Sequence, residues 1–283
     1  MIQIINKLAL QSHIKMTDRE FWGLRTYCLI TGASRGIGRN FSIEFSRRFA
    51  ANSLVVLLAR SEAGLLETKS LIIKANPQVK VVTSTIDLGN PDSESFLKII
   101  RDSLVDVDLK PKDFELSVIV HNVGSVGDVS EGTSQMSDIA KWQNYFALNV
   151  TSVASLNSQF LKVFPDGSTK WRSIINVTSL AAIKPIKSMG YYCAGKAARE
   201  MFFKVLAEEN PTLDVLNYSP GPVDTDMVSE VMRNTGDAET KGMFLNLKET
   251  KTILTVHQTT ERIISLLDSG KYESGQHVDY YDK

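Results

Sequence analysis

The sequence predicts an α/β protein: a single doubly wound, Rossmann-type domain with a central seven-stranded parallel sheet flanked by helices. Short apolar runs rich in β-branched residues alternate with segments of helical periodicity along most of the chain. These runs are apolar almost throughout, as expected for strands that helices cover on both faces. No linker rich in Pro, Gly or Ser and no internal repeat divides the 283 residues, so one domain is the simplest interpretation.

Seven runs are expected to be strands, joined by right-handed helical crossovers. The predicted strands are 26–31, 53–59, 79–86, 115–121, 172–179, 213–219 and 275–281. Helical periodicity is clearest over 38–50, over 62–75 and around 251–268. The polar stretch that follows residues 216–227 and runs through Lys251 predicts a helical excursion beside the ligand crevice.

Residues 26–283 are assigned to the domain, and residues 1–25 to an N-terminal extension that is expected to be flexible or dispensable. The first 15 residues contain two lysines but no arginine and no acidic residue. A weak transit peptide is therefore an alternative interpretation of this segment. Met16 offers a second plausible start.

The composition argues against several classes of protein. The 32 basic and 32 acidic residues give a formal net charge of zero and form no long block, so neither a nucleic-acid surface nor a membrane patch is expected. No run reaches the roughly 18 apolar residues of a membrane span. Two isolated cysteines, Cys28 and Cys193, fit a reducing compartment, and four scattered histidines predict no metal site. We expect a cytoplasmic protein whose partner is a small molecule.

A glycine-rich loop, TGASRGIG from Thr31 to Gly38, directly follows the first predicted strand and opens a helix. Its glycines leave room for a pyrophosphate at a helix N-terminus, where free N–H groups and the helix dipole favour an anion. Such a loop alone could be only a tight turn, but its place in a βαβ unit favours a dinucleotide site. The predicted cofactor-binding residues here are Gly32, Ala33, Ser34, Arg35, Gly36, Ile37 and Gly38.

The residues after the second predicted strand indicate which dinucleotide binds. Sites that prefer NAD usually place an acidic residue there, whereas this chain has Arg60 and Ser61. A guanidinium suits a 2′-phosphate, and Arg35 can supply a second positive charge. We therefore predict NADP(H) as the cofactor, with Arg60 and Ser61 in its site. The alternative is that Arg60 is simply a solvated residue at a strand end.

Two tyrosines stand side by side in YYCAGK, and helix geometry distinguishes them. Tyr192 and Lys196 are four residues apart and share a helix face, whereas Tyr191 and Lys196 diverge by roughly 140°. An unperturbed tyrosine titrates near ~10. A lysine ammonium on the same face should stabilise the phenolate and lower the pKa of Tyr192. Taken alone, the stretch could also be an ordinary surface pair.

Several motifs occur in a fixed order, and together they are highly specific. They are TGASRGIG, HNVG (121–124), ALNV (147–150), a serine thirteen residues before a tyrosine, Tyr-x-x-x-Lys, and Pro-Gly after the sixth predicted strand. Over roughly residues 26–281 the chain resembles the short-chain dehydrogenase/reductase family. It departs from the usual Asn-Asn-Ala-Gly of that family at His121 and Val123, where we expect altered packing and not lost activity.

The resemblance implies a role for each matching residue. Ser179 would hydrogen-bond the substrate carbonyl oxygen, and Tyr192 would donate a proton to it as hydride arrives. Lys196 would hold the nicotinamide ribose, and Asn149 would order a water in the proton relay. Further cofactor contacts are implied for Asp87, Leu88, Asn122, Gly124, Tyr192, Lys196, Val223, Asp224, Thr225, Asp226 and Met227. Gly221 would flank the nicotinamide and the substrate.

A closer likeness is to the pterin-reducing members of that family. It rests on VGDVSEG (126–132), YYCAGKAARE (191–200), NYSPGPVDTDM (217–227) and SGQHVDYYD (274–282). It implies NADPH-dependent reduction of pterin side-chain carbonyls, those of sepiapterin and 6-pyruvoyl-tetrahydropterin, in tetrahydrobiopterin biosynthesis. It also implies a homodimer built on a helix pair that includes residues 143–162.

Asp279 would anchor the pterin, because a carboxylate can accept two parallel hydrogen bonds from its N–H edge. From the sequence alone Asp279 could instead end an edge strand or face a subunit interface. Trp142, Phe146 and Met227 could stack on the flat ring, although a core role is the simpler prediction for each. Two alternative functions stay open: a general NADPH-dependent carbonyl or diketone reductase, and a non-catalytic NADP-sensing protein.

Overall fold

The structure is a computed structural model that describes residues 20–282. The expectations for residues 1–19 therefore lie outside the described residues. Phe21 is only 1% exposed and packs in the core, with Trp22 against it. Because these two side chains belong to the packed core, the domain begins before Thr26, and the expected boundary at residue 26 is too late.

Seven parallel strands form one sheet in the order β3-β2-β1-β4-β5-β6-β7, which confirms the predicted architecture. The strands are β1 (Thr26–Thr31), β2 (Leu54–Ala59), β3 (Lys80–Thr85), β4 (Leu116–His121), β5 (Trp171–Val177), β6 (Asp214–Ser219) and β7 (His277–Asp279). The order reverses direction between β1 and β4. In doubly wound sheets such a switch point, at the carboxyl ends of the strands, is where ligands bind.

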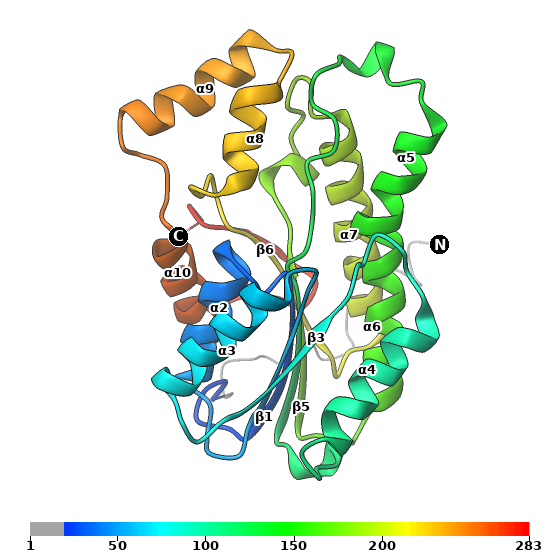
Figure 1. The fold of residues 1–283 in the computed structure, drawn as a ribbon, viewed down its shortest axis with the longest axis vertical. Coiled ribbons are helices and arrows are strands. Elements are labelled where there is room, and N and C mark those ends of the chain that lie inside the picture. Colours follow the sequence, from blue (N-terminus) through cyan, green and yellow to red (C-terminus); the bar gives the residue numbers. More distant parts are fainter. Residues whose placement is uncertain (1–19, 283) are drawn as a thin grey trace, which may run out of the picture.

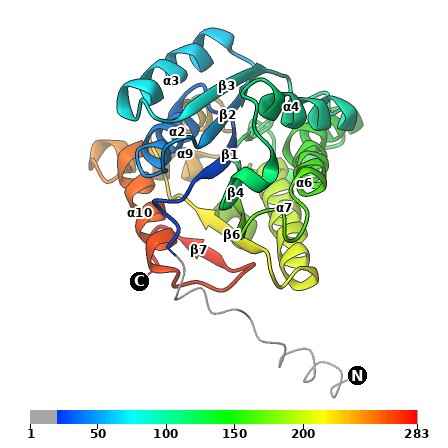
Figure 2. The same ribbon diagram turned by 90° about the horizontal axis from the view of Figure 1, so that it is seen from below.

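Helices cover both faces of the sheet, with α2, α3 and α10 on one side and α4, α6 and α7 on the other (Figures 1 and 2). The helices are α2 (Gly36–Ser46), α3 (Glu62–Ala75), α4 (Ser93–Val105), α5 (Ile139–Phe146), α6 (Ser152–Val163), α7 (Gly190–Glu209), α8 (Asp226–Asn234), α9 (Ala238–Glu249) and α10 (Val256–Ser269). The predicted polar excursion is the α8–α9 pair, which lies beyond the carboxyl ends of the strands in Figure 1.

The two layers of helices explain why the strands read as continuous apolar runs. Along β1, Cys28 and Ile30 point into the core with α2, α3 and α10, while Tyr27 and Leu29 point into the core with α4, α6 and α7. Every β1 residue is buried, although successive side chains face opposite sides.

Some predicted ends shift. The fifth strand stops at Val177 rather than at residue 179, so Ser179 lies on the loop just beyond the sheet. The last strand is only His277–Asp279, and Asp279 is its final residue. Both shifts move a predicted site residue to the carboxyl edge of the sheet, where the crevice lies.

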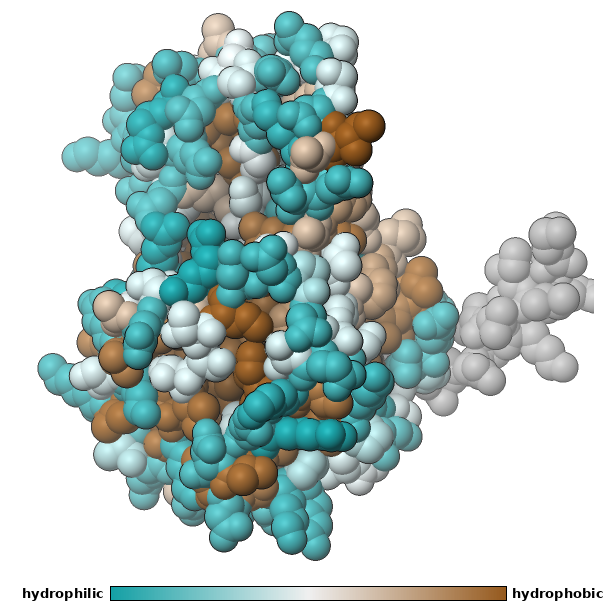
Figure 3. Space-filling view, turned by 45° about the vertical axis from the view of Figure 1, so that its right-hand side comes forward, coloured by the Kyte–Doolittle hydropathy of each residue, from teal (hydrophilic) through white to brown (hydrophobic). Residues whose placement is uncertain are grey.

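The face in Figure 3 is mostly hydrophilic, with hydrophobic side chains in separate patches. Within residues 20–282, no helix has both the length and the apolar character needed to cross a membrane. The same residues hold no group of three or more His, Cys, Asp or Glu placed to bind a metal ion.

Candidate active site

The loop between β1 and α2 has the shape that a pyrophosphate requires. Gly32 and Gly36 have φ of +68° and +56°, a region that favours glycine. A Cβ on Gly38 would overlap with the carbonyl oxygen of Gly32, so the close approach of loop and helix also depends on glycine. No side chain caps the N-terminus of α2. Its first N–H groups are therefore available to an anion, and the loop fits a dinucleotide.

The turn after β4 braces this loop. The Thr31 hydroxyl oxygen accepts hydrogen bonds from the N–H groups of Asn122 and Val123, each 3.0 Å long. The Asn122 side chain donates to the carbonyl oxygen of Thr31 over 2.9 Å. A Cβ on Gly32 would lie 2.8 Å from the Asn122 amide nitrogen. Asn122 thus holds the glycine loop in place.

His121, at the end of β4, is fully buried, with its Nε2 3.3 Å from the Asn157 amide oxygen. Burial lowers the pKa of His121 to about 3, and the nearby Arg199 charge acts in the same direction. The imidazole is therefore neutral at physiological pH and serves packing, in agreement with the expectation for this departure from the family motif.

α7 separates the two adjacent tyrosines as helix geometry requires. The Lys196 Nζ lies 5.5 Å from the ring centre of Tyr192, and it donates a 2.7 Å hydrogen bond to the carbonyl oxygen of Val177. Tyr191 instead is 1% exposed and packs on Trp142, with the ring centres 4.2 Å apart. Trp142 therefore has the packing role that was the simpler prediction.

The pKa of Tyr192 shifts upward, opposite to the expected lowering. Burial raises the pKa of Tyr192, and it outweighs the hydrogen bond with Ser179 and the charge of Arg199, which both lower it. Burial, with a smaller contribution from Arg199, also holds the pKa of Lys196 well below its usual value. Lys196 is a weakened cation in this pocket, so desolvation decides the pKa of the tyrosine.

Ser179 and Asn149 reach the same place from different elements. Ser179 lies close enough to Tyr192 to lower its pKa, and its hydroxyl accepts from the N–H of Ala181 over 3.2 Å. Asn149 lies on a π-helical turn, Ala147–Thr151, a type of distortion that is frequent at functional sites.

The Asn149 amide oxygen accepts from the N–H of Ser125 over 2.8 Å. A Cβ on Gly124 would lie 3.3 Å from that oxygen and 3.9 Å from the Lys196 Nζ. Asn149 and Lys196 therefore converge on Gly124, at the carboxyl edge of the sheet.

The residues predicted for the adenine half follow β2 and β3. Arg60 is exposed and makes no ion pair with any described residue. Ser61 caps α3 by accepting from the N–H of Gly64 over 3.2 Å. Asp87 is exposed, whereas Leu88 packs in the core. Arg60 is thus the free cation at this end of the crevice among residues 20–282.

The segment from Val223 to Met227 borders the crevice opposite the glycine loop. Val223 is buried and forms a bridge to Leu254. Asp224 pairs with Lys248 over 3.1 Å. Thr225 directly precedes α8, and Met227 packs partly buried in the cluster that α8 and α9 share with the start of α7.

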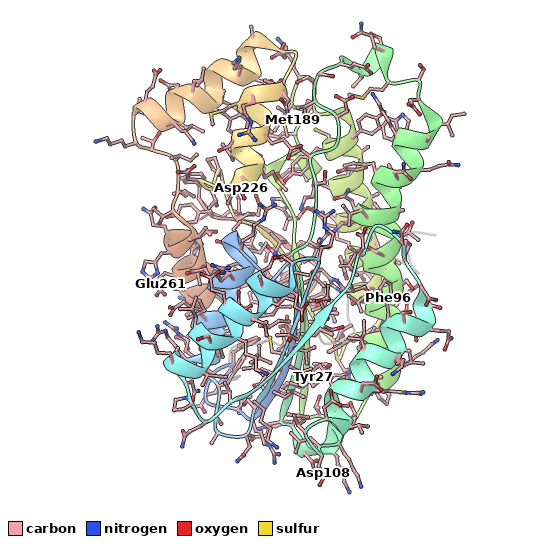
Figure 4. The ribbon with its side chains drawn as sticks, viewed as in Figure 1. Tyr27, Phe96, Asp108, Met189, Asp226 and Glu261 are labelled. Atoms are coloured by element: carbon pink, nitrogen blue, oxygen red, sulfur yellow. The ribbon has the colours of Figure 1, made fainter. Side chains whose placement is uncertain are left out.

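Asp226 forms an ion pair with Arg35, and these side chains are 70% and 71% exposed. Figure 4 labels Asp226 at the end of α8 nearest α2. The pair therefore joins two predicted cofactor-binding residues across the mouth of the crevice. While Arg35 is paired with Asp226, its charge is not free for the cofactor phosphate that it is expected to bind.

Asp279 is the last residue of β7, at the carboxyl edge of the sheet. Its two carboxylate oxygens accept from the Ser219 hydroxyl over 2.6 Å and from the N–H of Tyr281 over 3.1 Å. Gly221, with φ of +72°, lies in the turn after β6. It is close to Tyr280 and Tyr281, the two residues that follow Asp279. Each carboxylate oxygen has a second lone pair, so Asp279 can still accept two further hydrogen bonds.

One buried charge is absent from the predicted residues. Arg199 is 1% exposed and lies seven residues after Tyr192 on α7. Positions i, i+4 and i+7 share a helix face, so the spacing of Tyr192, Lys196 and Arg199 was a readable signal.

A cavity of about 330 Å³ opens beside this centre, between α5 and the loop that contains Ser125. Asn149 lines it, but neither Tyr192 nor Ser179 does. The cavity therefore adjoins the candidate active site at Asn149, and Ser179 and Tyr192 lie outside its lining.

Comparison with known proteins agrees with this geometry. The family model described as short chain dehydrogenase matches residues 26–236. The sepiapterin reductase of Bos taurus is 36% identical over 259 residues, which cover 92% of this chain and 96% of the bovine protein. The sepiapterin reductase of Mus musculus is 35% identical over 256 residues, 90% of this chain and 96% of the mouse protein.

Solved structures share the fold. The KRED1-Pglu enzyme has a TM-score of 0.73 at 25% identity, covering 89% of this chain and all of that one. A short chain dehydrogenase from Escherichia coli CFT073, solved in complex with NADPH, has a TM-score of 0.72 at 24% identity, covering 93% and 99%. The protein therefore belongs to the short chain dehydrogenase family and is an oxidoreductase that acts on carbonyl or hydroxyl groups.

Proposed function

We propose that this protein reduces the side-chain carbonyl of pterins with NADPH. The proposed substrates are sepiapterin and 6-pyruvoyl-tetrahydropterin, and the proposed pathway is tetrahydrobiopterin biosynthesis. The observation that carries the proposal is the Asp279 carboxylate at the end of β7, on the sheet edge beyond which Ser179 and Tyr192 meet. Similarity to sepiapterin reductases over about nine-tenths of the chain supports it.

The cofactor would supply a hydride, and the chain's residues would orient it. The glycine loop and the open N-terminus of α2 would bind the pyrophosphate. Arg60 would bind the 2′-phosphate, because a guanidinium matches phosphate geometry and no described carboxylate occupies it. Arg35 would join it on release from Asp226. Lys196 would hold the nicotinamide ribose.

The proton would come from Tyr192. As the carbonyl carbon gains a hydride, its oxygen gains the phenol proton, with the Ser179 hydroxyl donating a hydrogen bond to the same oxygen. The raised pKa suits this direction of reaction, because it keeps the phenol protonated at neutral pH. The phenolate left behind would be reprotonated through Lys196 and a water held by Asn149.

The pterin would lie with its N–H edge on Asp279. A carboxylate that accepts two parallel N–H bonds fixes both the position and the plane of the ring. The side-chain carbonyl would then point along the sheet edge toward Ser179 and Tyr192. Gly221 would flank the ring without a side chain to obstruct it.

General reduction of diketones is the second candidate. The observation that favours it is that Ser219 and the Tyr281 N–H already hydrogen-bond Asp279, as expected of a carboxylate that organises the end of the chain. A small diketone would need only Ser179, Tyr192 and Lys196. A non-catalytic NADP sensor has no support of this kind.

The proposal includes a cytoplasmic homodimer. α7 exposes Met201 and Val205, at 59% and 47%, and α6 runs alongside it. Two such helix pairs would bury these side chains against each other. Light scattering on the purified chain tests the homodimer, and a monomer would contradict it. Cell fractionation tests the cytoplasmic location, and recovery of the protein in organelles would contradict that.

The test is NADPH oxidation with sepiapterin, followed by absorbance in the wild type and in Tyr192→Phe. We expect wild-type turnover and a loss of roughly 100- to 10,000-fold in kcat in the variant, with NADPH affinity nearly unchanged. Turnover of neither sepiapterin nor a diketone would refute the enzyme. Full activity in Tyr192→Phe would refute the proton donor.

A further inference from the structure

Arg199 is the buried cation that none of the assigned roles uses. Tyr192, Lys196 and Arg199 occupy one face of α7, at i, i+4 and i+7. Arg199 is among the largest fully buried side chains. Buried arginines are normally paired with a carboxylate. Within residues 20–282, however, Arg199 forms no ion pair.

The guanidinium is held entirely by neutral oxygens. It makes four hydrogen bonds: Nε and one terminal nitrogen donate to the Asn176 amide oxygen over 3.1 and 2.7 Å, and the terminal nitrogens also donate to the carbonyl oxygens of His121 over 2.7 Å and Val123 over 2.8 Å. These contacts satisfy most of its five N–H groups without neutralising its charge. Arg199 therefore stays positive at neutral pH.

These contacts connect α7 to the turn after β4. The two carbonyl oxygens belong to residues on either side of Asn122, whose side chain holds the glycine loop. Gly124, next in the turn, faces Asn149 and Lys196. One guanidinium therefore sets the distance between the helix that carries the Tyr–Lys pair and the turn that supports the cofactor loop.

Among the described residues, none of the other titratable groups around Arg199 forms an ion pair with it. On β4, His121 is held neutral. On α5, burial raises the pKa of Tyr145, so its phenol is also neutral. On α7, the Glu200 carboxylate bonds the Thr178 hydroxyl over 2.9 Å, His277 over 2.7 Å and Lys204 over 2.7 Å. Its negative charge raises the pKa of Lys196 and so opposes Arg199, whose effect on that pKa is the larger. The positive charge of Arg199 therefore acts on Lys196 and Tyr192.

Resting on the proposed function, we propose that Arg199 is a positioning residue for the Tyr192–Lys196 pair. Its planar fork fixes the turn of residues 121–124 against α7, and its permanent charge disfavours a second positive charge on Lys196. The lowered pKa of Lys196, to which Arg199 contributes after burial, agrees with this arrangement. A lysine that loses its proton readily can reprotonate Tyr192 after each turnover.

The test follows the titration of Lys196 itself, which needs no turnover. The full chain is labelled with 13C at the lysine Cε atoms, and Lys196→Met assigns the signal by NMR. In the wild type we expect the Lys196 signal to titrate at lower pH than the other lysines. In Arg199→Met it should move to higher pH, because the neighbouring positive charge is gone.

Arg172→Met is the matched control. Arg172 is also a buried arginine, but it bonds Asp166 and Thr212 away from the site. Its loss should leave the Lys196 titration unchanged. A folded Arg199→Met whose Lys196 titrates as in the wild type would overturn the proposal.

Arg199→Lys tests the charge of Arg199 separately from its planar guanidinium group. It also provides the test if Arg199→Met does not fold. It keeps the charge, so Lys196 should titrate as in the wild type, and a move to higher pH would overturn the proposal. It loses the planar fork, so kcat should fall by roughly 10- to 100-fold. An unchanged kcat would overturn the positioning role. A wild type without turnover would refute only the proposed function, because the titration is read independently.

Discussion

The two sides of the crevice are held by different kinds of interaction. On one side, the glycine loop, the turn after β4 and α7 are joined by buried and partly buried hydrogen bonds through Thr31, Asn122 and Arg199. On the other side, the α8–α9 segment packs on the start of α7 through an apolar cluster, and two of its ion pairs, Arg35–Asp226 and Lys187–Glu239, have all four side chains at least 67% exposed.

The two kinds of interaction differ in how much free energy their loss costs. A buried donor or acceptor that loses its partner costs about 1–3 kcal/mol, whereas an exposed ion pair contributes about 0–1 kcal/mol. The first side is therefore fixed in one geometry, whereas the exposed ion pairs of the second side can open at little cost. A reductase that must admit both a cofactor and a substrate is served by this division.

The largest expected effect comes from adding one methyl group to each side. Gly38→Ala would force a Cβ onto the carbonyl oxygen of Gly32, so the glycine loop must shift. We expect NADPH affinity to fall by roughly 100-fold or more, measured by fluorescence titration. Gly242→Ala in α9 meets nothing within 4 Å. It should leave affinity unchanged and stabilise the helix by up to about 1 kcal/mol. Equal effects of the two substitutions would contradict the contrast.

The charge at the adenine end should have the next largest effect. Arg60→Asp removes the free guanidinium and places a carboxylate where a 2′-phosphate would lie. Loss of a charged hydrogen bond of about 1.5–3 kcal/mol predicts a fall in NADPH affinity of roughly tenfold or more, with NADH less affected. An unchanged ratio of the NADPH and NADH dissociation constants would remove Arg60 from the site.

A single hydroxyl sharpens the comparison. Thr31→Val leaves the N–H groups of Asn122 and Val123 without their acceptor in a partly buried place. We expect the free energy of unfolding to fall by about 1–3 kcal/mol. The control is Thr225→Val, whose hydroxyl bonds only the nearby Val223 carbonyl oxygen, over 3.3 Å. Denaturant titration of both variants checks the difference, and an equally stable Thr31→Val would count against a braced loop.

The smallest effect is expected at the mouth of the crevice. Asp226→Asn releases Arg35 and should change the free energy of unfolding by less than about 1 kcal/mol. Because Arg35 is then free for the cofactor phosphate, NADPH should bind a few-fold more tightly at low salt, and the gain should shrink as salt screens it. Weaker binding of NADPH would show that Asp226 itself holds the cofactor.

The sequence was informative where a function depends on local spacing. All seven strands, the glycine loop and the shared face of Tyr192 and Lys196 follow from periodicity and motif. The pKa of Tyr192 did not follow, because burial depends on the whole fold and outweighs one neighbouring charge. The spacing of Arg199 places it on the same helix face as Tyr192 and Lys196, but its partners, two carbonyl oxygens and an amide, form no motif that would indicate its role.

The exposed side was harder still to predict. Arg35 and Asp226 are 191 residues apart, and nothing local to either residue indicates that they pair. The split of the polar excursion into α8 and α9 likewise depends on caps such as Asp237, which accepts from the N–H of Thr240 over 2.7 Å. Contacts between residues far apart in the sequence, which only the folded chain brings together, were not predictable from local patterns.

The most direct test of the proposed function compares two substrates in two proteins. The ratio of kcat/KM for sepiapterin to that for 2,3-butanedione is measured with NADPH in the wild type and in Asp279→Asn. If Asp279 anchors the pterin, the variant loses sepiapterin reduction by roughly tenfold or more while diketone reduction changes little. Equal losses on both substrates, or a wild type that reduces only the diketone, would contradict a pterin reductase.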